Sequence, residues 1–133
     1  MKAPRMIYET NLEKLKSLGL LNVKSHVKIK NDPYMPLCVE WVGKNQLSIA
    51  HYYEQNGDLM ADPEMTLEIH PDLNMVEVLT YTQHGLGIFK EVYTYDDNGK
   101  KLGVKLNMKR ELNNFLGMWL KNLKDQGFKY EST

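Results

Sequence analysis

The sequence predicts an α+β fold: an antiparallel meander sheet of five or six strands, with a long amphipathic C-terminal helix packed on one face. Three observations support this prediction. Turn residues separate short apolar segments between residues 34 and 107, a helical apolar pattern fills residues 108–127, and a shorter helical pattern lies near the N-terminus.

The N-terminal segment, residues 1–33, is expected to contain a short helix followed by a turn. Thr10 and Glu13 have the spacing of a capping box, and Gly19 follows the apolar stripe as a stop signal. Asn31-Asp32-Pro33 then marks the turn.

Residues 34–107 alternate apolar segments with turn residues, which is typical of antiparallel strands joined by short connections. Asn98-Gly99 is a strong signal for a tight hairpin. The predicted strands are residues 37–43, 46–54, 65–70, 75–82, 88–95 and 101–106.

The long C-terminal helix is the clearest predicted element. Its apolar side chains recur every three or four residues with lysines opposite, and Gly127 ends it. The apolar positions are Leu112, Phe115, Leu116, Trp119, Leu120 and Leu123. Which sheet face this helix covers stays open, because both faces carry apolar residues and a single bulge would exchange them.

Composition limits the classes of function. Lys+Arg and Asp+Glu are equal at 17 each, so no overall field attracts nucleic acid, which is not an expected partner. No apolar run approaches the roughly 20 residues of a membrane span, and residues 1–14 contain no apolar signal core. The single Cys38 excludes an internal disulfide and fits a reducing cytoplasm. We therefore expect a cytoplasmic protein whose residues 1–133 form one domain.

One segment, HYYEQNGDLMADPEM at residues 51–65, concentrates the chemistry of the chain. If strands 46–54 and 64–70 pair around a loop at residues 55–63, His51 lies on the core face, roughly opposite Leu67. It is then either a buried histidine satisfied by a backbone or carboxylate partner, or an acid–base group tuned by its surroundings.

Four carboxylates, Glu54, Asp58, Asp62 and Glu64, cluster beside this histidine. Close carboxylates repel unless a cation or proton compensates, so Asp58, Asp62 and Glu64 are candidate ligands of a divalent cation. However, the spacing does not match an EF-hand loop or a zinc motif. A turn at the loop tip explains the same residues, so no cofactor is expected and a cation is the alternative.

Aromatic side chains mark a candidate interaction surface on the sheet face that the long helix leaves open. Tyr52, Tyr81, Phe89 and Tyr93 alternate there with glutamates. Tyrosines among carboxylates are typical of surfaces that bind a partner, since the ring is apolar and its hydroxyl tolerates water. Coverage by the N-terminal helix or a crossing strand is the competing interpretation.

From about Tyr34 to Phe128 the chain resembles a family of small prokaryotic proteins of unknown function, often encoded on plasmids and other mobile elements. The resemblance is carried by HYYEQNGDLMADPEM, LTYTQHGLGIFKEVY and NNFLGMWLKNLKDQGF, at residues 51–65, 79–93 and 113–128. It implies no activity or ligand, and the first 33 residues lie outside it.

Two functions remain open at this level, together with a structural alternative. The first is a non-catalytic accessory protein that binds a protein partner through the aromatic face or the 54–64 loop. The second is a metal-assisted hydrolase or nuclease, in which Asp58, Asp62 and Glu64 hold a cation and His51 is its base or a ligand. A homodimer formed through the aromatic face is the structural alternative.

Overall fold

The computed structural model of the protein describes residues 6–131, which form two α-helices, three 3-10 turns and eight strands. Along the chain these are α1 (Ile7–Ser17), η1 (Leu20–Asn22), β1 (His26–Asn31), β2 (Tyr34–Gly43), β3 (Gln46–Gln55), β4 (Asp58–His70), η2 (Pro71–Leu73), β5 (Met75–Gln83), η3 (His84–Leu86), β6 (Ile88–Glu91), β7 (Tyr93–Tyr95), β8 (Lys101–Val104) and α2 (Leu106–Gln126).

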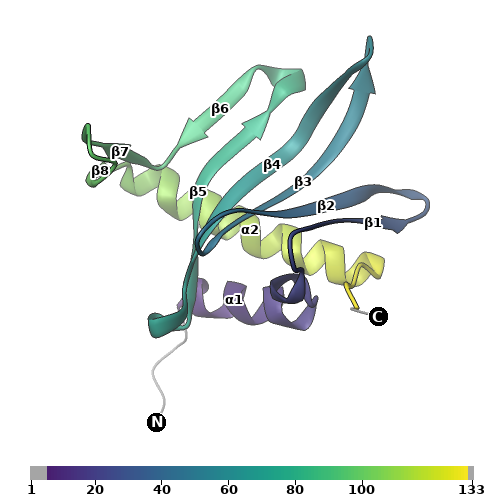
Figure 1. The fold of residues 1–133 in the computed structure, drawn as a ribbon, viewed down its shortest axis with the longest axis horizontal. Coiled ribbons are helices and arrows are strands. Elements are labelled where there is room, and N and C mark those ends of the chain that lie inside the picture. Colours follow the sequence, from purple (N-terminus) through teal and green to yellow (C-terminus); the bar gives the residue numbers. More distant parts are fainter. Residues whose placement is uncertain (1–5, 132–133) are drawn as a thin grey trace.

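Strands β1 to β6 form one antiparallel sheet in chain order, and β7 and β8 form a separate two-stranded ribbon. Both helices lie across one face of this sheet (Figure 1), so the predicted α+β architecture with an antiparallel meander is confirmed. Leucines of α1 and α2 share one buried core with alternate residues of the strands. The opposite face of the sheet is called the open face below.

Helix α2 follows the prediction closely, beginning at Leu106 and ending before Gly127, whose φ is 95°. Its stripe of leucines is buried, as the periodicity requires. Helix α1 begins at Ile7, three residues before the predicted cap, and the hydroxyl of Thr10 instead donates to the Ile7 carbonyl at 3.0 Å. No helix in residues 6–131 combines the length and apolar character needed to cross a membrane.

The prediction for residues 1–33 was incomplete, because β1 lies within them and forms an edge of the sheet beside β2. Val27 and Ile29 contact the core, while Lys28 and Lys30 are exposed. Lysines are common on edge strands, where they hinder pairing with another chain. Because these two lysines are charged, the short alternation of apolar and polar residues in β1 was not recognised as a strand.

The predicted strand at residues 88–95 is divided, because the chain turns at the buried Val92. The Val92 amide donates to the Leu79 carbonyl, and the Val92 carbonyl accepts from the Lys105 amide, at 3.0 and 2.9 Å. Strand β8, predicted as part of the meander, therefore pairs with β7 outside the six-stranded sheet.

The predicted 55–63 loop is wrong. Strands β3 and β4 pair up to a two-residue turn at Asn56-Gly57, whose positive φ angles of 54° and 86° suit a tight hairpin. Asp58 and Asp62, the two carboxylates assigned to this loop, thus both lie in β4. The register shifts between Ala50 and Tyr52, opposite Pro63, which has no amide hydrogen for the ladder.

Candidate functional site

His51 lies in the core and not beside the carboxylates. Because β3 and β4 pair as far as the two-residue turn, Leu47 and not His51 lies opposite Leu67. On the other side of β3, His51 pairs with Leu37 of β2. Its Nδ1 lies 2.9 Å from the Pro36 carbonyl oxygen, which can only accept, so this nitrogen carries the hydrogen. The imidazole is 9% exposed and its ring centre lies 5.7 Å from that of Trp119 and 5.9 Å from that of Phe128.

We expect His51→Ala to reduce the free energy of unfolding by about 1–2 kcal/mol, because it removes aromatic packing and leaves a carbonyl without its donor. Urea denaturation followed by circular dichroism measures the change. His26→Ala is the matched control, since His26 is exposed at the start of β1. Equal stability of the two variants would contradict the structural role of His51.

The three predicted metal ligands have separate surroundings. Asp58 is exposed at the start of β4, and Asp62 accepts a hydrogen bond from Gln83 Nε2 at 3.0 Å. Glu64 accepts a hydrogen bond from the Tyr52 hydroxyl at 2.5 Å. The structure does not gather them into a set of three ligand atoms within residues 6–131.

The four predicted interaction residues do not share one surface. Tyr81 lies on the helix side, edge-on to Phe115 of α2 with ring centres 5.6 Å apart. The cause is a bulge at Leu79, which reverses the alternation of β5.

Three of the four remain at or near the open face. Tyr52 and the exposed Phe89 lie on it, whereas the Tyr93 hydroxyl donates to Glu77 and is thereby engaged within the protein.

The β1–β2 and β3–β4 hairpins diverge toward their tips (Figure 1). The open face is hollowed between residues of these two hairpins. The hollow has a volume of about 530 Å³ and is called the open-face cavity. Pro36, Cys38, Leu59 and the ring of Tyr52 supply its apolar lining. Its charged lining residues are Lys28, Glu40 and Glu54.

Two groups that line the cavity, the Tyr52 phenol and the Cys38 thiol, are held in their neutral forms. Burial, followed by the hydrogen bond to Glu64, raises the pKa of Tyr52 far above its ordinary value. Burial also raises the pKa of the Cys38 thiol, although Lys28 opposes this shift. A protonated phenol and thiol suit binding better than nucleophilic attack.

Glutamates give the open face an acidic character within a chain of zero formal net charge. The strand register places six of them there: Glu40, Glu54, Glu64, Glu68, Glu77 and Glu91. Lys28 lies in one of the same rows and Lys101 reaches Glu68 from β8. A surface of this kind favours partners that carry positive charge.

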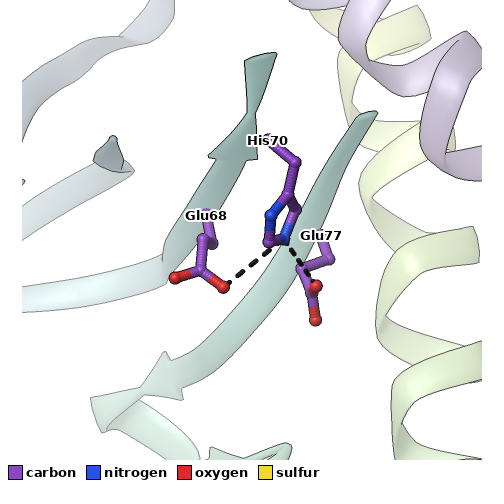
Figure 2. A group of neighbouring side chains, drawn as sticks. All are labelled: Glu68, His70 and Glu77. Atoms are coloured by element: carbon purple, nitrogen blue, oxygen red, sulfur yellow. Dashed lines mark hydrogen bonds and ion pairs between the residues drawn. The ribbon is translucent and has the colours of Figure 1, made fainter. Parts of the chain in front are cut away.

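A second cluster, not identified from the sequence, joins Glu68, His70 and Glu77 (Figure 2). His70 Nε2 lies 2.7 Å from Glu77 Oε2 and 3.4 Å from Glu68 Oε1. The sequence does contain a signal for this cluster: Glu68 and His70 alternate in one strand, and Glu77 lies in the next. Using that signal would have required knowing which residues of the two strands pair across the turn at residues 71–74.

The surroundings of Glu77 stabilise its charged form. Burial favours the neutral carboxyl, but hydrogen bonds from Tyr93 and His70, with the charges of Lys101 and Lys109, outweigh it and lower the pKa of Glu77. The cluster thus links β4 and β5 to the β7–β8 ribbon and the start of α2.

Comparison with protein families identifies the chain over most of its length. A family model described as a domain of unknown function, DUF6908, matches residues 9–129. No curated protein and no solved structure matches the chain. The match includes most of α1 and the whole of the sheet, the ribbon and α2, and the chain therefore belongs to the DUF6908 family of unknown function.

Proposed function

We propose that this protein is a non-catalytic binding protein that holds an apolar, basic segment of a partner protein in the open-face cavity. The cavity itself carries the proposal. Its volume of about 530 Å³ falls within the roughly 300–1,000 Å³ typical of binding pockets. Tyr52 is a suitable anchor, because its hydrogen bond to Glu64 holds the ring in place before a partner arrives.

Charge supports a basic partner. Glu40 and Glu54 line the cavity, and further glutamates continue along the open face. A lysine or arginine beside an apolar side chain would satisfy both kinds of lining group. Rim charges of this sort mainly increase the rate of association and make it sensitive to salt.

The positions of the candidate catalytic residues favour binding over the metal-assisted hydrolase. That reaction needs His51 beside Asp58, Asp62 and Glu64, whereas His51 packs against Trp119. The resemblance to proteins of plasmids and other mobile elements supports an accessory role. The lone thiol of Cys38 in the cavity suits a cytoplasmic setting.

Selection from a random peptide library displayed on phage, followed by fluorescence anisotropy of the selected peptide, tests the proposal. We expect the peptide to combine apolar and basic residues, and Tyr52→Ala to weaken its binding at least about tenfold. Tyr95→Ala is the matched control, because Tyr95 is an exposed tyrosine of β7. It should leave the affinity unchanged.

A second variant separates lost binding from lost folding. Leu59 is 64% exposed at the tip of the β3–β4 hairpin and lines the cavity, so Leu59→Ser should weaken binding without altering stability. Binding that survives both Tyr52→Ala and Leu59→Ser would refute the cavity as the contact. Self-association removed by the same variants would identify a second copy as the occupant, against the proposal.

A further inference from the structure

We infer that Glu68, His70 and Glu77 form a binding site for one zinc ion, with the two carboxylates and His70 Nε2 as its ligands. The three side chains project from β4 and β5 toward one point, as Figure 2 shows. None of them lines the open-face cavity, so the zinc site is separate from the proposed contact with a partner.

The distances between ligand atoms are close to those that zinc requires. A tetrahedral ion with bonds of about 2.1 Å separates its ligand atoms by roughly 3.4 Å. His70 Nε2 lies 3.4 Å from Glu68 Oε1 and 2.7 Å from Glu77 Oε2. Small rotations of Glu77 would open the shorter distance, and all three ligand atoms lie within 4.8 Å of one another.

The hydrogen bonds around Glu77 leave Oε2, the carboxylate oxygen nearer His70, available to bind an ion. The Tyr93 hydroxyl donates to Oε1, whereas Oε2 is the atom that faces His70. Metal-binding carboxylates are commonly oriented in this way by a second hydrogen bond. His70 and Glu77 also line a cavity of about 260 Å³, which leaves room for solvent as a fourth ligand.

The choice of ion follows from the ligand types. One imidazole and two carboxylates suit zinc, whereas calcium and magnesium prefer oxygen ligands alone. Two lysines compete with any cation: Lys101 Nζ lies 2.7 Å from Glu68 Oε1, and Lys109 Nζ lies 4.0 Å from Glu77 Oε1. Lys101 is partly exposed on the short β7–β8 ribbon, so its ammonium group can turn into solvent when zinc arrives.

Calorimetric titration of the chelator-treated full chain with zinc chloride tests the site. We expect one saturable event with a micromolar dissociation constant, and a loss of affinity of about tenfold or more in His70→Ala and in Glu77→Gln. His26→Ala is the control, because it removes an exposed histidine elsewhere on the sheet. Calcium chloride should give no saturable heat.

Lys101→Ala provides the decisive comparison, since it removes a partly exposed side chain that competes with zinc for Glu68. Zinc affinity should rise at least about fivefold in this variant. If the cluster only links the ribbon to the sheet, neither the parent chain nor Lys101→Ala will bind zinc, and the inference fails. It also fails if His70→Ala binds zinc as the parent does, or if calcium binds and zinc does not.

Discussion

Leu116→Ala is expected to lower the free energy of unfolding by about 3 kcal/mol, the largest effect of any substitution considered for this protein. Leu116 has 0% exposure and lies in the middle of α2, within the core shared by both helices and the sheet. Truncation removes apolar contacts and leaves a cavity that the surrounding strands cannot fill without moving. Urea denaturation curves give the difference.

Met118→Ala is the matched control for this prediction. Met118 is in the same helix, two residues away, but it is 62% exposed on the side that faces solvent. Its truncation should change stability by less than about 0.5 kcal/mol. Equal losses in Leu116→Ala and Met118→Ala would show that α2 does not cover the sheet as the structure has it.

Asn113→Ala is expected to cost about 2 kcal/mol, because Asn113 satisfies backbone groups in the interior. Its Oδ1 accepts from the Val78 amide at 3.0 Å, and its Nδ2 donates to the Lys109 carbonyl at 2.7 Å. The side chain of Asn11 donates to the Asn113 carbonyl at 2.9 Å, so the same residue also joins α1 to α2.

Asn114→Ala separates this role from a general effect of asparagine in a helix. Asn114 is the next residue and is exposed, so alanine, with its higher helix propensity, should leave stability unchanged or slightly raise it. Thermal and urea unfolding of both variants provide the comparison. A stable Asn113→Ala protein would mean that the Val78 amide finds another acceptor.

Long periodic patterns were sufficient to predict most of the fold. The stripe of leucines predicts α2, and the turn residues predict the strand boundaries. Tertiary packing agrees with these local preferences, so the predicted elements are present in the structure. Strand β1 escaped prediction because Lys28 and Lys30 conceal a short alternation. Lysines on an edge strand hinder its pairing with another chain, and the same lysines make the segment resemble a solvated loop in the sequence.

Strand register explains why the site was harder to predict than the fold. The two-residue turn at Asn56-Gly57 placed Leu47, and not His51, opposite Leu67, and a bulge at Leu79 moved Tyr81 to the helix side. A shift of one residue exchanges the two faces of a strand, and the local sequence pattern does not predict where such a shift occurs. The cluster of Glu68, His70 and Glu77 likewise depends on the register between two strands.

An amide NMR titration of the isotope-labelled protein with the peptide selected from the phage library tests most directly whether the open-face cavity is the binding surface. We expect the shifted signals to centre on Cys38, Tyr52 and Leu59, three residues that line the cavity. Shifts centred instead on the exposed side of α2 around Met118, with those three signals unmoved, would contradict the proposed function.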